Sequence, residues 1–330
     1  ALIYGFFNQG TESSHGWGIP MATDIAFALG VLYLLGNKIP TSLKVFLTAL
    51  AIVDDLGAVL IIAFFYTADF TFPMLFTGIG FVAFLLLSKA FGIRNTIFYA
   101  IVGIFGVWLP FLLSGVHATI ASVLVAFTIP ADSKVDEILF VDKIKKYLDK
   151  FRNADTTNAP TLTEEQLHLL EHIRITTKDA MTPLQRLEHR MHSLVSFIIM
   201  PIFALANAGV TFSNDILAET TSNVTLGVVF GLVAGKVIGV FGVSLAMIKL
   251  KWANMPVGLN NMHLFGVGFL ASIGFTMSLF VTNLAFHNPE YELQAKLGIF
   301  IASTIGGIIG FTLLNKNTKH LNINNSNTNA

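Results

Sequence analysis

The sequence has no cysteine and few charged residues. None of its 330 residues is Cys, and Asp, Glu, Lys and Arg together make up 12%, whereas an ordinary soluble protein has roughly a quarter charged residues. The absence of thiols excludes disulfides and thiolate metal sites. The formal net charge is zero, so no excess of positive charge indicates nucleic acid as a partner. The apolar stretch 1–7 has no basic region before it, which is not typical of a signal peptide.

Hydrophobic residues are abundant instead, at 54% of the chain. Such a chain has too little polar surface to cover itself in water. Because a helix satisfies its own backbone hydrogen bonds in hydrocarbon, and about 20 apolar residues span a bilayer, we expect an all-α membrane protein built as a multi-span helix bundle. Nine candidate spans are approximately 17–36, 45–66, 70–88, 96–113, 115–130, 193–212, 224–248, 262–286 and 293–314. The fifth is short enough to be buried inside the bundle.

The loops between these spans alternate in charge. Each odd-numbered span is followed by a loop that carries Lys or Arg, and the other loops are acidic or neutral apart from Lys296. Basic loops stay on the cytoplasmic side of a membrane. We therefore expect a cytoplasmic C-terminus and four segments: 1–130 with the end of one span plus five spans, 131–192 as a charged cytoplasmic connection, 193–314 with four spans, and 315–330 as a cytoplasmic tail.

The charged connection contains signals for short helices. Its residues 131–190 include ten basic and eleven acidic side chains, which is typical of a solvated segment. Thr161 with Glu164 matches a capping box, and Thr182 followed by Pro183 predicts a helix that runs into the sixth span. A first amphipathic helix is predicted by four residues that share one helical face, namely Val141, Ile144, Leu148 and Phe151.

Four ionisable residues lie near the middle of apolar spans: Asp24, Asp54, Asp55 and Lys236. Each would cost about 2.5–3.5 kcal/mol at a helix centre on insertion scales. A purely structural ion pair explains one Asp with one Lys, but three acids and one base leave excess negative charge in a low dielectric. Buried charges of this kind mark ion pathways and proton relays.

The adjacent carboxylates predict a site that exchanges cations. Neighbouring positions on a helix point about 100° apart, so one carboxylate can face Lys236 while the other faces a water-filled cavity. Burial and a neighbouring carboxylate both favour the protonated form of an acid. Sodium is a hard cation that takes oxygen ligands, by the logic that holds for calcium and magnesium. Protons and sodium ions would therefore compete for the same oxygens.

Two of the spans look interrupted. Thr23 and Asp24 break the first span beside Pro20, and the eighth contains several Gly, Ser and Thr residues. Interrupted segments in corresponding positions of two halves point to a binding site at the midplane of a transporter. Asp24 could compensate facing helix N-termini, and Lys236 facing C-termini. Close helix packing is an equally good explanation for the glycines alone.

Several of these strings resemble the NhaA family of bacterial sodium/proton antiporters. The matching pieces are A-T-D-I-A-F-A-L-G (22–30), L-K-V-F-L-T-A-L-A-I-V-D-D-L-G-A (43–58), S-G-V-H-A-T (114–119), R-L-E-H-R-M-H (186–192), F-A-L-A-N-A-G-V (203–210), A-G-K-V-I-G (234–239) and I-G-F-T-M-S (273–278). The resemblance covers nearly all of the chain except the insertion 131–180 and the tail. Family members have almost three further helices before the point that matches Ala1.

The resemblance implies a fold of twelve helices with inverted repeats and two crossed, discontinuous helices. It implies that Asp54 and Asp55 bind sodium and protons in turn, that Lys236 pairs with Asp54, and that Thr23 and Asp24 lie at the crossing. It places Glu188, His189 and His192 at a cytoplasmic funnel that responds to pH. It further implies a multi-pass protein of the bacterial inner membrane, in contact with lipids, with a possible homodimer and no cofactor besides the transported ions.

Other functions compatible with these residues remain open. A sodium-coupled symporter of similar fold would need a larger substrate cavity with polar anchors, and a structural or sensory membrane protein would have no use for the carboxylates. A transport-incompetent fragment is a further alternative. An intramembrane aspartyl protease takes one Asp from each of two helices, whereas Asp54 and Asp55 are adjacent. We therefore expect a transporter and not an enzyme.

Overall fold

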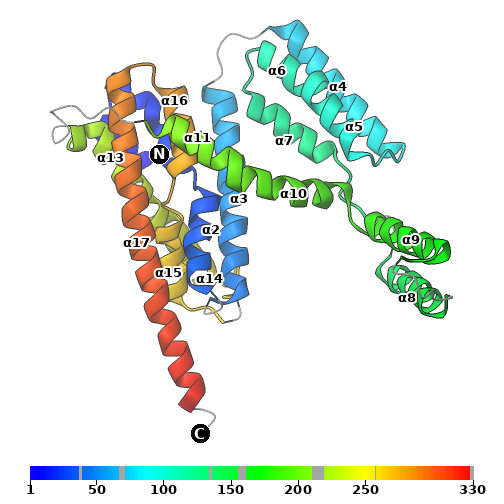
Figure 1. Cartoon of the computed structure of the whole chain (residues 1–330). Helices are drawn as coiled ribbons and strands as arrows, with labels where there is room; N and C mark the ends of the chain where they lie inside the picture. The colour runs from blue at the N-terminus through cyan, green and yellow to red at the C-terminus, as the bar shows by residue number, and fades with distance from the viewer. Residues whose placement is uncertain are drawn as a thin grey trace. The chain divides into compact units, whose positions relative to one another are not determined.

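Figure 1 shows the computed structural model of the chain, which describes residues 1–36, 39–66, 71–133, 136–154, 161–209, 219–256 and 258–327. Every regular element within these ranges is helical. The chain forms two compact units, the first made of Ala1–Thr67 with Ser196–Ala330 and the second of Ala68–Val195. The predicted all-α membrane fold is confirmed.

Six continuous helices are long and apolar enough to cross a membrane. They are α3 (Thr41–Phe65), α4 (Phe72–Ala90), α5 to α6 (Thr96–Ile101 and Leu109–Leu113), α10 to α11 (Pro183–Leu194 and Met200–Asn207), α13 to α14 (Asn223–Lys236 and Val243–Lys249) and the first part of α17 (Pro289–Asn327). A π-helical segment joins the two parts of each divided helix. The sixth span thus begins about ten residues earlier than the sequence indicates, because the helix that starts at Pro183 continues into it.

Two further spans are bent helix pairs. The 3₁₀ helix Glu12–Met21 and α2 (Ile25–Leu34) meet at 42°, and α15 (Asn261–Leu270) and α16 (Phe275–Ala285) meet at 45°. They coincide with the first and eighth predicted spans, where the sequence indicates interruptions. The short fifth span is α7 (Ala118–Thr128).

The first unit packs around α13 and α17. In Figure 1, α17 runs alongside α13 and α15, and α1 (Leu2–Asn8) packs against α13. Small residues permit this close approach: a Cβ on Gly227 of α13 would lie 2.6 Å from the Asn8 amide nitrogen. Gly268 of α15 likewise faces the backbone of Val237, whose Cα would be 3.3 Å from an added Cβ. Close helix packing therefore explains the glycine at position 268, on α15 before the break in the eighth span.

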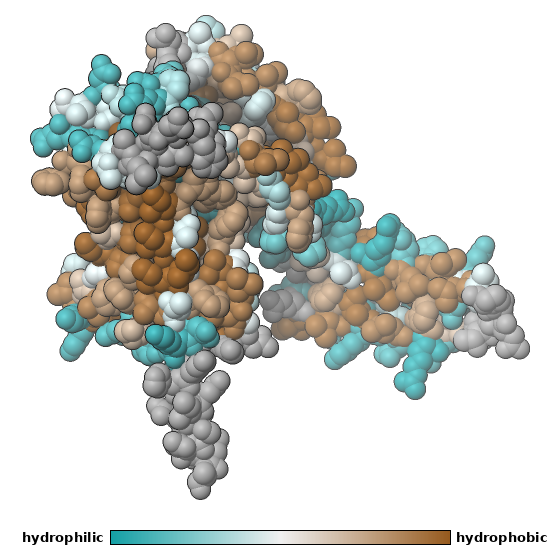
Figure 2. All heavy atoms as spheres, turned by 60° about the vertical axis from the view of Figure 1, so that its left-hand side comes forward, coloured by the Kyte–Doolittle hydropathy of each residue, from teal (hydrophilic) through white to brown (hydrophobic). Residues whose placement is uncertain are grey.

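Large apolar side chains cover much of the outside of the helices. Figure 2 shows hydrophobic residues spread over the face that it presents, and Phe64 and Leu205 are about four-fifths exposed, at 79% and 82%. Lipid can solvate such side chains where water cannot. This pattern agrees with a multi-pass membrane protein.

The second unit contains α4 to α7 and the charged connection. Leu85, Tyr99, Val107 and Phe111 form its apolar core. The connection folds into α8 (Glu137–Asn153) and α9 (Glu164–Ala180), which pack together, and α10 follows. The two amphipathic helices that the sequence predicts are therefore present.

One predicted helix start is wrong and another is confirmed. The N-cap of α9 is Thr163, whose hydroxyl accepts from the amide of Gln166 while Gln166 caps in return; the predicted Thr161 lies outside the first turn. Both threonines precede an acidic or amide residue by three positions, so the motif alone does not choose between them. Thr182 forms the corresponding capping box with Gln185 at the start of α10.

Candidate functional site

The first break places Asp24 at the start of α2. Pro20 departs from helical geometry at φ −80° and ψ 16°, and residues 22–24 run extended between the 3₁₀ helix and α2. Proline restricts the chain and removes a backbone donor, which favours a helix break close to this point. The carboxylate of Asp24 then caps α2, accepting from the amide of Phe27 at 3.1 Å.

The same carboxylate also caps the helix after the second break. Its other oxygen accepts from the backbone amide of Thr276 at 2.9 Å and from the Thr276 hydroxyl at 2.5 Å. Asp24 is 1% exposed, and a negative charge is stabilised by the positive ends of helix dipoles. Two helix N-termini, those of α2 and α16, thus share one buried carboxylate.

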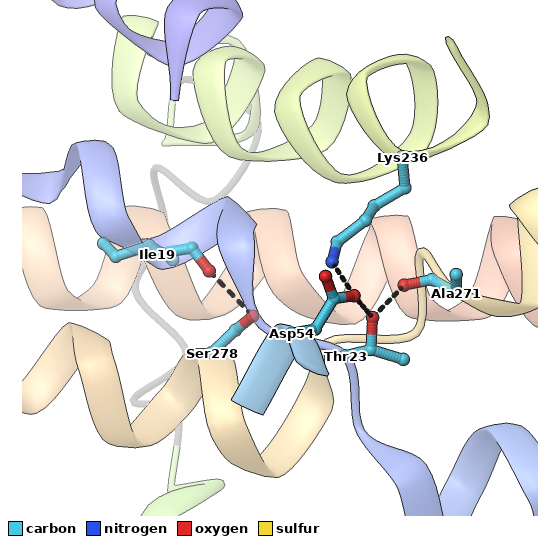
Figure 3. Close-up of polar contacts among 6 residues, drawn as sticks. All are labelled: Ile19, Thr23, Asp54, Lys236, Ala271 and Ser278. Atoms are coloured by element: carbon cyan, nitrogen blue, oxygen red, sulfur yellow. Dashed lines mark hydrogen bonds and ion pairs between the residues drawn. The ribbon is translucent and has the colours of Figure 1, made fainter. Parts of the chain in front are cut away.

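Residues at each helix break form hydrogen bonds with backbone groups that the other break leaves without a partner inside its own helix. The amide of Asp24 donates to the carbonyl of Ile273 at 2.6 Å. The hydroxyl of Thr23 donates to the carbonyl of Ala271, and the hydroxyl of Ser278 donates to the carbonyl of Ile19, each at 2.9 Å (Figure 3). Unpaired backbone groups are costly in a membrane, so these bonds are what permits two interrupted helices to persist there.

Lys236 forms an ion pair with Asp54. Its ammonium nitrogen lies 2.5 Å from Asp54 Oδ2, and Figure 3 shows the lysine reaching down from α13 toward the carboxylate on α3. The lysine side chain is 9% exposed and that of Asp54 is 24% exposed. Lys236 is also the last α-helical residue before the π-helical segment Val237–Gly242, a type of distortion that is frequent at functional sites.

Thr23 joins the ion pair to the second break. Its hydroxyl lies 2.9 Å from Asp54 Oδ2 and 2.9 Å from the carbonyl oxygen of Ala271. A hydroxyl has one hydrogen to donate, so it serves only one of these acceptors at a time. The backbone of α15 and the charge on α3 are therefore linked through a single proton donor.

Asp55 has different surroundings from its neighbour. Its Oδ1 is buried and has no hydrogen-bond partner among the residues that the structure describes. An unsatisfied buried carboxylate oxygen is costly, whereas a proton or a cation would satisfy it. The two neighbours thus differ in their contacts: Asp54 Oδ2 pairs with Lys236 and lies within hydrogen-bond distance of the Thr23 hydroxyl, whereas Asp55 Oδ1 has no such partner among the described residues.

The predicted pH-responsive residues lie elsewhere in the chain. Glu188, His189 and His192 are exposed residues of α10, in the second unit. They take no part in the contacts that link Thr23, Asp54 and Lys236. Within the described ranges, no group of three or more His, Cys, Asp or Glu side chains could hold a metal ion.

The sequence does not single out three partners in this network. Thr276 and Ser278 are two of several Ser and Thr residues in the interrupted eighth span, and the third partner is the backbone carbonyl of Ala271. The signal that could find the first two is a hydroxyl side chain next to a glycine-marked break in an apolar segment. A backbone carbonyl has no such signal, since its partner depends on how the helices meet.

Comparison with known proteins identifies the family. A family model described as Na+/H+ antiporter 1 matches residues 1–314. The chain belongs to this family. Na(+)/H(+) antiporter NhaA 1 of Psychromonas ingrahamii is 45% identical over 314 residues, which are 95% of this chain and 72% of that protein. Na(+)/H(+) antiporter NhaA of Oleidesulfovibrio alaskensis is 46% identical over 315 residues, 95% of this chain and 70% of that protein.

A relative from Helicobacter pylori strain G27, also named Na(+)/H(+) antiporter NhaA, is 45% identical over 316 residues, 94% of this chain and 70% of its own length. The resemblance to NhaA antiporters that the motifs indicate is therefore confirmed over nearly the whole chain. Members of the Na+/H+ antiporter 1 family are transporters rather than enzymes, in agreement with the prediction from the buried carboxylates.

Proposed function

We propose that this chain exchanges sodium ions for protons across the bacterial plasma membrane, by alternating access to a site at Asp54 and Asp55. The observation that carries the proposal is the contrast between the two carboxylates. Asp54 is paired with Lys236 at 2.5 Å, while Asp55 keeps a buried oxygen without a partner among the described residues. The relatives are named Na(+)/H(+) antiporters, which supports the same exchange in this chain.

Electrostatics supplies the coupling between the two ions. A sodium ion at Asp55 brings a positive charge close to the Asp54–Lys236 pair, and a proton on either carboxylate removes negative charge from the same region. Like charges repel strongly in a low dielectric, so the site holds the cation or the protons but not both. Exchange follows when the site opens to the two sides of the membrane in turn, and binds the cation on one side and protons on the other.

The broken helices give the site a place to change shape. We infer that the two breaks cross, because Thr23 and Asp24 bond to residues 271–276 on both sides of the second break. Thr23 can donate to Asp54 or to the Ala271 carbonyl, but not to both. A protonated Asp54 carboxyl would accept a weaker hydrogen bond from the Thr23 hydroxyl than the carboxylate does. The charge state of Asp54 on α3 would therefore be transmitted to the break between α15 and α16.

The expected regulation and assembly belong to the same proposal. Glu188, His189 and His192 would adjust the activity with pH, since histidine changes charge between about pH 5 and 8. The C-terminus would be cytoplasmic, by the charge of the loops. The homodimer that the resemblance implies also remains a prediction.

A flux assay tests the proposed function. The chain is reconstituted in vesicles with a trapped pH dye, and we expect a sodium pulse to release protons from the vesicle lumen. Asp55→Asn should abolish this signal, and Glu171→Gln, which removes an exposed carboxylate of α9, should preserve it. A solute-dependent sodium uptake without proton movement would identify a symporter instead, and no flux from a chain that still binds sodium would identify an incomplete transporter.

A further inference from the structure

Two histidines of the charged connection lie one turn apart on α9. His168 and His172 are the ends of the stretch H-L-L-E-H, and both residues are exposed. Residues four positions apart are neighbours on a helix surface, and this is the spacing at which a helical histidine pair binds zinc. The pair belongs to the second unit, whereas Asp54 and Asp55 belong to the first, so it is not part of the proposed sodium site.

The two imidazole rings have the separation that a shared metal ion requires. Their centroids are 5.2 Å apart, with a tilt of 36° between the rings. A zinc–nitrogen bond of about 2.0–2.1 Å places the ring centroid about 3.2 Å from the metal. Two such rings at the tetrahedral angle have centroids about 5 Å apart. The observed separation therefore permits both imidazoles to bind one ion.

An aromatic side chain of α8 packs against one of the two rings. The ring of Tyr147 stacks on the imidazole of His172, with centroids 5.4 Å apart and planes within 9° of parallel. This contact restricts the orientation of the imidazole, and a ligand that is oriented in advance loses less entropy on binding. Neither imidazole of the pair has a hydrogen bond or an ion pair within the described part of the chain, so no described side chain competes with an ion for its nitrogens.

Carboxylates surround the pair on the surface of α9. Glu164 and Glu165 lie four and three positions before His168, and Glu171 lies three positions after it. All three are exposed, and the carboxylate of Glu171 is paired with Arg174 at 2.7 Å. Negative charge of this kind raises the local concentration of cations. The described residues contain no group of three or more metal-binding side chains, so the site that we assign has two protein ligands.

We propose that His168 and His172 together bind one divalent transition-metal ion of the zinc type, each through one imidazole nitrogen. Zinc accepts nitrogen ligands, and neutral imidazole is the commonest protein ligand for metals of this class. Magnesium and calcium prefer oxygen ligands, so the pair should discriminate against them. A bound ion would join successive turns of α9 and stabilise this helix of the insertion 131–180. The site does not depend on the proposed exchange of sodium for protons.

Zinc titration of the purified full chain, without a histidine tag, tests this site. The protein is stripped of metal with a chelator and kept in detergent at about pH 7.5, where an ordinary imidazole is mostly neutral. Binding is followed by calorimetry, with magnesium at the same concentrations for comparison. We expect saturable binding of one zinc ion per chain and no such binding of magnesium. The absence of saturable zinc binding, or equal binding of magnesium, would overturn the proposal.

Matched variants locate the bound ion. Loss of a group that only orients a metal ligand costs about 10–100-fold in affinity, so His168→Gln/His172→Gln should weaken zinc binding by at least about tenfold. The control His15→Gln/His287→Gln removes two exposed histidines from the other unit and should change the affinity less than about twofold, because distant sites act independently. Equal losses in the two double variants would overturn the proposal, since zinc would then bind to scattered surface histidines.

A variant of the proposed transport site completes the test. Asp55→Asn, which should abolish sodium binding, should leave zinc binding unchanged. Zinc binding that is lost in Asp55→Asn and kept in His168→Gln/His172→Gln would place the ion at the carboxylates and overturn the proposal. If circular dichroism shows that the histidine double variant has lost helix, the single variants His168→Gln and His172→Gln replace it. Each removes one of two ligands and should weaken zinc binding about tenfold, and an unchanged affinity in both would count against the site.

Discussion

Lys236→Met is expected to destabilise the protein through the charge that it leaves behind. The lysine is buried, and its ammonium group lies 2.5 Å from Asp54 Oδ2. Methionine has a similar length, so the substitution leaves little empty space. What remains is a carboxylate on α3 whose cationic partner is gone, which is the costly way to break a buried ion pair.

The size of the effect follows from the surroundings of Asp54. Removing one partner of a buried pair costs about 3–5 kcal/mol. Asp54 is 24% exposed and keeps the hydroxyl of Thr23 at 2.9 Å, so some water and one hydrogen bond still stabilise the charge. We therefore expect a loss of about 2–3 kcal/mol, which corresponds to a fall of roughly 5–10 °C in the thermal midpoint.

The measurement is thermal unfolding in detergent at about pH 8. The double variant Lys236→Met/Asp54→Asn lacks both charges and should regain at least half of the lost stability. An unchanged midpoint in the single variant, or a double variant no more stable than the single one, would refute the reasoning.

Three further outcomes are expected from the same structure. Thr276→Val removes one of the two hydrogen bonds that Thr276 donates to Asp24, which should lower the free energy of unfolding by about 1–2 kcal/mol in a denaturation titration; an effect below about 0.3 kcal/mol would contradict the capping role. Thr163→Ala should lower the free energy of unfolding by about 1 kcal/mol, and Thr161→Ala should leave it almost unchanged. The reverse order would mean that Thr161 is the N-cap of α9, as the motif with Glu164 predicts. Cysteines at Lys146 and Thr221, in a chain without native Cys, should react with an impermeant thiol reagent from opposite sides of the membrane, and labelling from one side would refute the span count.

The sequence is sufficient to locate the spans because hydrocarbon imposes a simple rule. A spanning segment must be apolar for about 20 residues, so the composition of 45–66 or 224–248 predicts α3 and α13 without knowledge of any contact. Charged residues inside such segments are rare, and the same rule therefore draws attention to Asp54 and Lys236. The structure brings these two together although 182 positions separate them.

Details that depend on the meeting of helices could not be predicted in this way. Thr161 and Thr163 satisfy the same short motif, so the motif alone does not choose between them. The bonds from Thr23 to Ala271 and from Ser278 to Ile19 join segments more than 240 positions apart. Their acceptors are backbone carbonyls, which every residue has, so no residue type marks them.

Sodium binding as a function of pH tests the central claim most directly. If protons and sodium compete for Asp54 and Asp55, calorimetric titration of the purified chain should show a sodium affinity that rises about tenfold per pH unit while one proton is displaced per ion. Asp55→Asn should abolish the binding at every pH, whereas Glu171→Gln should leave it unchanged. A sodium affinity that stays the same from about pH 6 to about pH 9 would contradict the competition between the two ions, even if the chain transports sodium.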